Sequence, residues 1–207
     1  MTINYILEVN DVHIEDYKKV IRPMLNESRY QHCLNVAKCA KELARKYGAD
    51  ENKAEITGLL HDIMKNTAIE EQIKILDDFG LNTDKIGFNE IDIKTPKLWH
   101  AKTGAEYLQY KLRIDDSDIL NAVRYHTTAR KDMSKLEKVI FVADFISDDR
   151  DYDGVEEIRQ AAHISLEAAM IEGLSFTICD LSSRKMPIHK DTIEAYNELI
   201  MKEKSDS

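Results

Sequence analysis

The residues Gly58-Leu59-Leu60-His61-Asp62-Ile63-Met64-Lys65 form a mostly apolar stretch that is interrupted by an imidazole and a carboxylate side by side. A buried carboxylate is costly unless it is paired with a charged group or bound to a cation. His61 offers a nitrogen ligand and Asp62 an oxygen ligand, and transition metals accept both. Taken alone, the dipeptide leaves open a helix whose polar face carries His-Asp by chance.

Further histidines and one aspartate recur along the chain in apolar or helix-ending contexts, namely His32, His100, His126 and Asp144. A carboxylate can bridge two ions through its two oxygens, whereas an imidazole supplies one nitrogen per ion. We therefore predict a two-metal site that Asp62 bridges. The first ion is expected on His32, His61, Asp62 and Asp144, and the second on His100 and His126. Each histidine also has a simpler interpretation, as a core, surface or helix-end residue.

Helical patterns cover most of the sequence, and sustained strand alternation is missing from it. Apolar residues recur at helical spacing after three capping-box pairs, which are Ser28 with Gln31, Thr67 with Glu70, and Ser134 with Glu137. We also expect a short helix at Ile14–Ile21, a loop over residues 81–95 and a charged loop over 147–154. The fold class is therefore all-α. We predict one domain over residues 1–207, with 1–25 as an N-terminal helical extension and 202–207 as a frayed tail.

The composition restricts the class of protein. The chain of 207 residues fits one medium domain, and its few glycines (7) and prolines (3) favour long helices. A net charge of -9 argues against a broad contact with nucleic acid or an anionic membrane. Cys33, Cys39 and Cys179 form no CxxC pair, which indicates reduced thiols in a cytoplasm. No apolar run approaches the roughly 18 residues of a membrane span.

Cationic residues close to the predicted ligands are candidates for binding phosphate. An acidic protein needs local positive charge to bind an anionic substrate, and arginine binds phosphate oxygens in pairs. The substrate-binding candidates are Arg29, Lys65, Thr127, Arg130 and Arg150, and the catalytic candidates are Asp62 and Lys65. Ordinary surface cations are the alternative. We assign His13, His163 and His189 structural or surface roles.

The order of these segments resembles the HD-domain phosphohydrolases, and most closely their YqeK branch, the symmetrical diadenosine tetraphosphate hydrolases. The resemblance runs from Arg29 to the last predicted helix. It is carried by Arg29-Tyr30-Gln31-His32, His61-Asp62-Ile63-Met64-Lys65, Leu98-Trp99-His100-Ala101, Arg124-Tyr125-His126-Thr127-Thr128, Glu137-Lys138-Val139-Ile140-Phe141-Val142-Ala143-Asp144, Gly154-Val155-Glu156-Glu157-Ile158-Arg159 and Tyr196-Asn197-Glu198-Leu199. Ala129 departs from the glycine that this branch usually has before the arginine.

The resemblance implies a single HD-domain helical bundle with a di-iron site. It also implies a substrate, diadenosine tetraphosphate, that is cut into two molecules of ADP. In this interpretation the metal pair activates water for in-line attack on a β-phosphorus. Two alternatives stay open. One is an HD phosphohydrolase for a nucleoside monophosphate, a guanosine alarmone or a cyclic dinucleotide, and the other is a metal-bearing nucleotide sensor without turnover. A homodimer is also left open.

Overall fold

A computed structural model describes residues 13–205 of the chain, and helices are the only regular secondary structure within them. It contains α1 (Ile14–Ile21), α2 (Glu27–Tyr47), α3 (Glu51–Leu60), α4 (Ile69–Asp78), α5 (Glu90–Lys94), a 3-10 turn (Pro96–Leu98), α6 (Trp99–Tyr110), α7 (Ser117–Tyr125), α8 (Lys135–Ile146), α9 (Val155–Ile164), α10 (Leu166–Ser183) and α11 (Lys190–Ser205). The predicted all-α class is confirmed.

Two predictions concern the ends of the chain. The expected helix Ile14–Ile21 is present as α1, but residues 1–12 of the predicted extension lie outside the described part. The expected frayed tail began at residue 202, whereas α11 continues to Ser205. Residues 206–207 lie outside the described part as well. Among the described helices, none combines the length and the apolar character that crossing a membrane needs.

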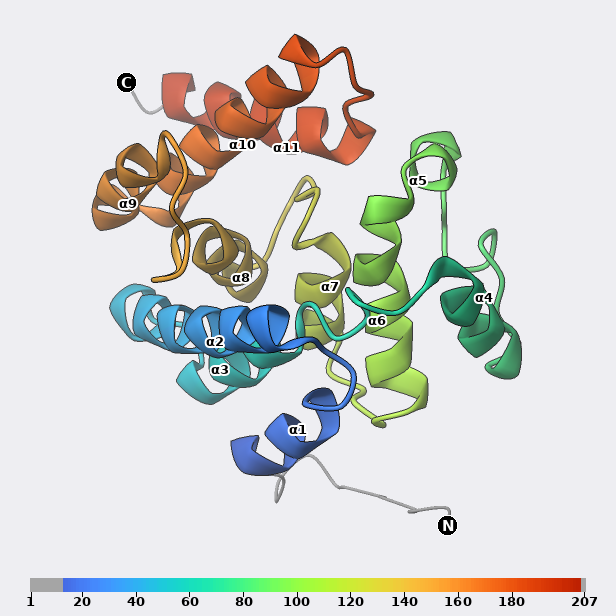
Figure 1. Cartoon of the computed structure of the whole chain (residues 1–207). Helices are drawn as coiled ribbons and strands as arrows, with labels where there is room; N and C mark the ends of the chain where they lie inside the picture. The colour runs from blue at the N-terminus through green and yellow to red at the C-terminus, as the bar shows by residue number, and fades with distance from the viewer. Residues whose placement is uncertain (1–12, 206–207) are drawn as a thin grey trace.

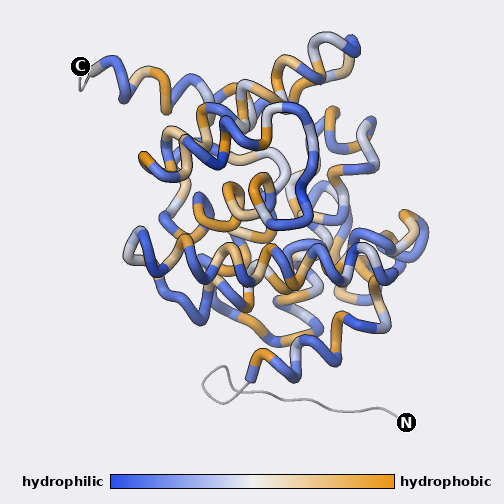
Figure 2. The backbone as a smooth tube through the Cα atoms, turned by 60° about the vertical axis from the view of Figure 1, so that its left-hand side comes forward, coloured by the Kyte–Doolittle hydropathy of each residue, from blue (hydrophilic) through white to orange (hydrophobic). Residues whose placement is uncertain are grey.

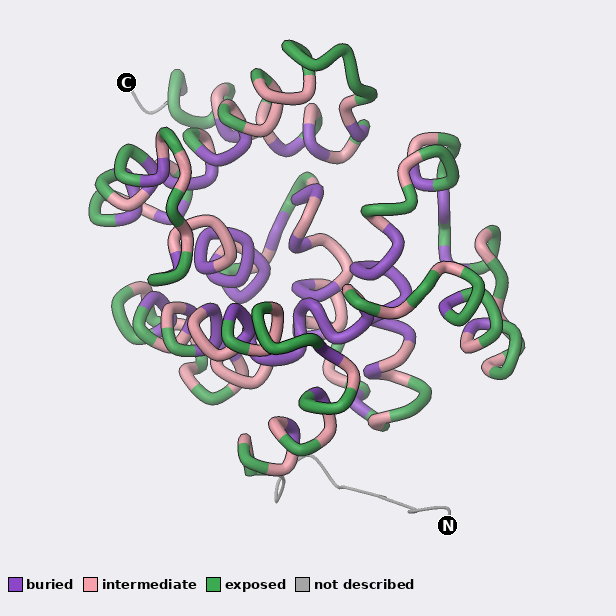
Figure 3. The backbone as a smooth tube through the Cα atoms, in the orientation of Figure 1, coloured by how far each residue is buried: buried purple, intermediate pink, exposed green. Residues whose placement is uncertain are grey.

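Helix α8 lies at the centre of the bundle. It packs against α2, α3, α7, α9 and α10, and Figure 1 shows α2 and α3 side by side on one side of it and α10 and α11 on the other. Seven of its twelve residues are buried, and Figure 3 shows it among the most deeply buried tubes. Its sequence is apolar on nearly all sides, as Figure 2 also shows for the middle of the molecule. Asp144 is therefore a carboxylate carried by the central helix.

Helices α2 and α3 approach each other closely at Gly58. A Cβ atom on Gly58 would lie 2.9 Å from the Cα of Ala37 and 3.0 Å from the backbone oxygen of Val36. Only a residue without a side chain fits between these two backbones. This contact sets the distance between the helix that carries His32 and the helix that leads into His61.

Helix starts follow the sequence rules in part. Ser134 caps α8 and forms the expected capping box with Glu137, and the Asp50 side chain caps α3. The predicted start at Ser28 is wrong, because the Asn26 side chain accepts the Arg29 N–H and begins α2 one residue earlier. The predicted box at Thr67 is also wrong, since α4 begins after Ala68 without a side-chain cap.

The predicted loop over residues 81–95 contains a short helix. Helix α5 starts at a capping box made by Asn89 and Asp92. A buried polar cluster holds this segment against the bundle, because the ammonium of Lys102 donates to Asp92 Oδ2 (2.6 Å) and to the Gly87 carbonyl (2.8 Å). His189, which we expected to be structural or superficial, is buried beside Asp92 with Nε2 3.4 Å from Oδ1. The cluster thus joins the start of α11 to a segment about 100 residues earlier in the chain.

Candidate metal centre

The six predicted ligands come from five helices and converge in the interior. His32 lies in α2, His61 and Asp62 follow α3, His100 lies in the first turn of α6, His126 follows α7, and Asp144 lies in α8. Adjacent residues of a helix diverge by about 100°, but α3 ends at Leu60. His61 keeps right-handed helical dihedrals (φ -55°, ψ -36°), and tighter turns follow it, in which the Ile63 N–H donates to the Leu60 carbonyl and the Lys65 N–H to the Asp62 carbonyl. In this arrangement the two adjacent side chains approach each other, with His61 Nε2 3.5 Å from Asp62 Oδ2.

Three of the histidines have their protonated nitrogen fixed by the backbone. Nδ1 of His61, His100 and His126 lies 2.7–2.8 Å from the carbonyl oxygens of Gly58, Lys97 and Val123, respectively. A carbonyl oxygen only accepts, so in each neutral ring Nδ1 carries the hydrogen and donates it. Each Nε2 then presents a lone pair to the interior. This is the orientation in which a histidine binds a metal ion.

The carboxylate of Asp62 divides these histidines into two groups. Its Oδ1 lies 2.9 Å from Nε2 of His100 and 3.4 Å from Nε2 of His126. Its Oδ2 lies 3.5 Å from Nε2 of His61. On the far side of His61, the Asp144 Oδ1 lies 3.8 Å from the same nitrogen and 2.9 Å from Nε2 of His32.

The donor set fits metal ions on geometric grounds. Among the described residues, three sets of ligand atoms lie within 4.8 Å of one another, and they are His32-His61-Asp62, His61-His126-Asp144 and Asp62-His100-His126. The buried His61 Nε2 and Asp62 Oδ1 have no hydrogen-bond partner there. Nε2 of His100 and Nε2 of His126 are 3.2 Å apart, and two lone pairs at that distance repel each other. A cation among these atoms removes the repulsion and supplies the missing partner.

The ionisation states also suit metal binding. Burial alone would raise the pKa of Asp62, but the neighbouring His61, His100 and His126 lower that pKa well below its usual range. Burial likewise opposes ionisation of Asp144, yet His32 and Arg150 hold its pKa well below the ordinary value. Burial lowers the pKa of His100 to about 4. At neutral pH the centre therefore offers carboxylates and a neutral imidazole, which are the ligand-competent forms.

Three of the predicted cations reach the centre. Arg29 Nη1 donates to Asp62 Oδ2 at 2.8 Å, and Lys65 Nζ lies 3.2 Å from Nε2 of His100. Arg150 donates from Nε to the Asp144 carbonyl at 2.6 Å and from Nη2 to its carboxylate. The side chains of these three residues are 27–32% exposed, whereas five of the six ligands are almost fully buried. The cations therefore lie between the ligands and solvent.

Thr127 and Arg130 have other surroundings. Thr127 follows His126, and its Oγ1 is buried without a hydrogen-bond partner among the described residues. Arg130 forms a two-point ion pair with Glu137 at 2.6 and 2.8 Å and lies over the ring of Tyr125. It also lines a groove beside α10 and α11. The predicted phosphate contacts of these two residues stay predictions.

One residue at the centre was missed from the sequence. Asp149 Oδ2 lies 2.7 Å from Nδ1 of His32. The loop over residues 147–154 was expected to be charged, but its amino-acid order does not indicate which carboxylate turns inward. Asp148, the neighbouring aspartate, instead pairs with Lys38 on the surface.

An all-α bundle that brings four histidines and two aspartates to one buried point defines a helical metallohydrolase of the HD type. A model of the HD domain matches residues 29–149. The chain is 38% identical to the protein named "Bis(5'-nucleosyl)-tetraphosphatase, symmetrical" from Halalkalibacterium halodurans, over 90% of this chain and 96% of that protein. The same name is given to a Bacillus subtilis protein that is 38% identical over 90% of this chain and 97% of its own length.

The fold is also found in a solved structure. A crystal structure from Clostridium acetobutylicum, described as a predicted HD superfamily hydrolase involved in NAD metabolism, matches with a TM-score of 0.84. The two chains are 36% identical, and the match covers 92% of this chain and 98% of the other. The chain belongs to the HD-domain family and, within it, to the group of the symmetrical bis(5'-nucleosyl)-tetraphosphatases.

Proposed function

We propose that this chain is a metal-dependent phosphohydrolase that cleaves diadenosine tetraphosphate symmetrically into two molecules of ADP. The observation that carries the proposal is the divided carboxylate of Asp62, whose Oδ1 faces His100 and His126 while Oδ2 faces His61. A carboxylate used at both oxygens is suited to bridging a metal pair. The choice of substrate is supported by two relatives that are named for this activity and that the chain matches over nearly their full length.

In this proposal the first ion is held by His32, His61, Asp62 and Asp144, and the second by Asp62, His100 and His126. We propose iron for both ions, in line with the family resemblance and with a mixed nitrogen and oxygen donor set that suits transition metals. When bound, such ions stabilise charge on phosphoryl oxygens and lower the pKa of a water molecule. Elemental analysis of protein purified without added metal tests both the identity and the number of ions.

The cations of the chain are proposed to bind and orient the polyphosphate. Lys65 Nζ lies on the side of the second-ion ligands, 3.2 Å from His100 and 3.8 Å from Asp62 Oδ1. Arg150 lies on the opposite side, beside Asp144. Phosphate held between the two would have its charge neutralised at both ends of the centre. Lys65 is proposed to stabilise the phosphate of the departing ADP, where negative charge accumulates.

The cationic roles are tested by single substitutions. Arg29→Ala and Arg150→Ala should lower turnover while the protein retains its metal, because each removes a phosphate contact and no ligand. Arg45→Ala is a matched control, since Arg45 is an exposed cation on the same helix as Arg29 and pairs with Glu51. Thr127→Ala and Arg130→Ala extend the series to the two remaining candidates. Equal turnover in Arg29→Ala, Arg150→Ala and Arg45→Ala would contradict the proposed phosphate contacts.

Product analysis tests the reaction itself. Diadenosine tetraphosphate is incubated with the protein in water enriched in oxygen-18, and the nucleotides are separated by chromatography. Attack on one of the two central phosphorus atoms gives ADP as the only nucleotide product, with the label in one of the two molecules. Equal amounts of AMP and ATP would reject symmetrical cleavage.

The alternatives appear as other outcomes of the same experiment. A panel of dinucleoside polyphosphates, mononucleotides, guanosine alarmones and cyclic dinucleotides distinguishes the substrate classes. Binding of diadenosine tetraphosphate without turnover by metal-loaded protein would identify a sensor. A cytoplasmic location is part of the proposal, supported by three free cysteines. The homodimer stays a prediction that light scattering of the purified protein tests.

A further inference from the structure

We propose that Asp149 is a positioning residue that fixes His32 as a ligand of the first metal ion. It does so by keeping the proton of His32 on Nδ1, which directs the lone pair of Nε2 toward His61 and Asp144. This inference rests on the proposed metal centre and does not depend on the substrate that the centre hydrolyses.

His32 needs an acceptor that its own helix does not provide. His61, His100 and His126 lie at the ends or in the first turn of helices, and each donates to the carbonyl three residues earlier. His32 lies inside α2, where carbonyl oxygens accept from the N–H four residues later. Its Nδ1 lies instead 2.7 Å from the carboxylate of Asp149, which follows 117 residues later.

The choice of protonated nitrogen is decided by the groups on either side of the ring. Carboxylates face both nitrogens, because Asp144 Oδ1 lies 2.9 Å from Nε2. A proton on Nε2 would bond to Asp144 and would take His32 out of the ligand set. The Nη2 group of Arg150, which only donates, lies 3.4 Å from Nε2 and also pairs with Asp144. Arg150 thus favours the lone pair on Nε2, and Asp149 accepts the proton on Nδ1.

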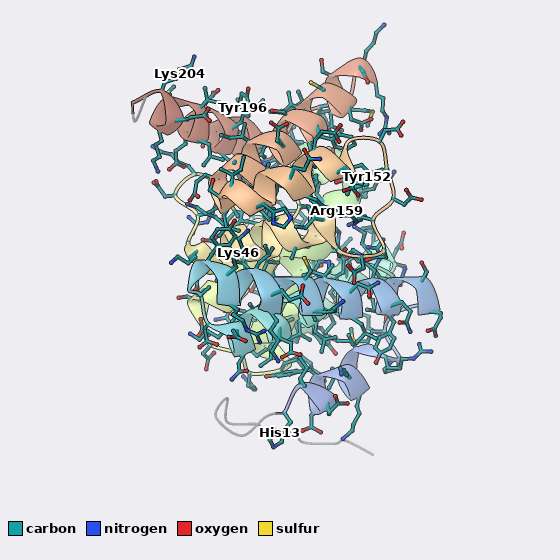
Figure 4. All side chains as sticks on the ribbon, turned by 90° about the vertical axis from the view of Figure 1, so that its left-hand side faces the viewer. His13, Lys46, Tyr152, Arg159, Tyr196 and Lys204 are labelled. Carbon is teal, nitrogen blue, oxygen red and sulfur yellow. The ribbon has the colours of Figure 1, made fainter. Side chains whose placement is uncertain are left out.

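The loop that carries Asp149 is held in place from several directions. Ser147 is fully buried, and its hydroxyl donates to Asp149 Oδ1 at 2.9 Å. Arg159 donates to the carbonyls of Ile146, Ser147 and Arg150 at 2.9–3.2 Å. Figure 4 shows Arg159 and Tyr152 beside this loop, above α2. A carboxylate fixed in this way can fix the orientation of a ligand ring in turn.

A carboxylate acceptor also changes the ligand chemically. Hydrogen bonding of Nδ1–H to a carboxylate makes the imidazole more basic and restrains the ring, and losing such a partner typically lowers metal affinity about 10- to 100-fold. The three other histidines donate to neutral carbonyls. The loss of Asp149 should therefore lower the affinity for the first ion, and it should not change the affinity of the Asp62-His100-His126 set for the second.

The test compares zinc release from four full-length proteins, which are the parent, Asp149→Ala, Asp149→Asn and Asp148→Asn. Each is loaded with Zn²⁺ and titrated with a chelator of known affinity. Asp148→Asn is the matched control, because it removes the same charge at the neighbouring position. The Asp148 side chain is exposed and pairs with Lys38 instead of with His32. We expect Asp149→Ala to lower the affinity for one of the two zinc ions about 10- to 100-fold. Asp149→Asn should lose less of this affinity, because the amide oxygen of asparagine still accepts the hydrogen bond from His32 Nδ1.

A spectroscopic readout separates positioning from a general structural effect. In nitrogen-15 spectra of the zinc-loaded protein, the Nδ1–H of His32 should be protected from exchange with water in the parent and in Asp149→Asn. In Asp149→Ala the signal of this N–H should be lost through exchange. Parent-like zinc affinity in both Asp149 variants, or equal weakening in Asp148→Asn, would overturn the inference. A parent that binds two ions but hydrolyses no dinucleoside polyphosphate would reject the proposed function while leaving the role of Asp149 in place.

Discussion

The close contact between α2 and α3 allows a sharp test of the fold through Gly58→Ala. A methyl group at this position would meet the Cα and N of Ala37 at 2.9 and 3.0 Å and the carbonyl oxygen of Val36 at 3.0 Å. These are backbone atoms, so no side-chain rotation relieves the contact. To restore ordinary separations, the two helices must move apart by about half an ångström.

The expected magnitude comes from two opposing terms. Overpacking of this kind typically costs about 1–3 kcal/mol. Replacing glycine by alanine inside a helix contributes about 1 kcal/mol in the opposite direction. The net change in the free energy of unfolding is therefore a loss of up to about 2 kcal/mol. The displacement also separates His32 from His61, so metal affinity should fall together with stability.

Gly104→Ala is the matched control. Gly104 also lies inside a helix, α6, but a Cβ there would have its nearest neighbours at 3.5 and 3.6 Å, on the side chains of Val123 and Ile63. That methyl group makes ordinary contacts, so the helix-propensity term should remain without the clash. We expect Gly104→Ala to match the parent or exceed it by up to about 1 kcal/mol.

Urea unfolding of the three proteins, followed by circular dichroism, measures the comparison. The propensity term is shared by both variants, so their difference isolates the clash and should be about 1–3 kcal/mol. The same samples are analysed for bound metal, which should fall only in Gly58→Ala. Equal free energies of unfolding in Gly58→Ala and Gly104→Ala would refute the argument that backbone contact sets the helix spacing.

Three further predictions concern the centre and its support. Asp62→Ala should contain almost no bound transition metal by elemental analysis, because both ligand sets use this carboxylate; parent-like metal content would contradict the bridge. His126→Ala should keep roughly one ion per chain and lose turnover, since its ring belongs to the second ligand set; two retained ions with parent-like activity would remove His126 from the site. Burial of Asp92 is outweighed by His189, Asn89 and Lys102, which lower its pKa from 3.8 to about 2. The ionised Asp92 therefore stabilises the folded protein by about 2 kcal/mol. This contribution should be fully present above pH 3.8 and should be lost as the pH falls through about 2. In urea unfolding at several pH values, Asp92→Asn should lack this part of the acid sensitivity and the exposed control Glu90→Gln should keep it; identical pH profiles of the parent and Asp92→Asn would contradict the assignment.

Much of the helical architecture could be predicted from the sequence because its signals are local. Ser134 lies just before an apolar periodic run and caps α8 as expected, and Asp50 caps α3 by the same local rule. At Ser28 the same rule was misleading, because Asn26 two residues earlier is an equally good cap. Helix α5 was missed because five residues are too few to establish a period, and its capping box lies in a polar stretch.

The candidate site could be predicted as a set of residues but not as a geometry. His61 and Asp62 were recognisable because a charged pair in an apolar run requires partners. The partition of Asp62 between two groups of histidines depends on where α3 ends, and helix ends are the least certain part of a sequence-based prediction. The roles of Asp149 and Arg159 depend on the path of a loop, which no local pattern encodes. The Arg130–Glu137 ion pair depends on the same kind of tertiary detail.

The distribution of the ligands over the chain has a consequence for synthesis on the ribosome. The second ligand set is complete once His126 has been made, whereas the first requires Asp144, which lies 112 residues after His32 in the sequence. At usual elongation rates, roughly 6 to 22 seconds separate the synthesis of His32 from that of Asp144. During that time α2 lacks α8, its central packing partner, and the first ion has no complete set of ligands. A nascent chain therefore contains every ligand of the second ion before it contains every ligand of the first.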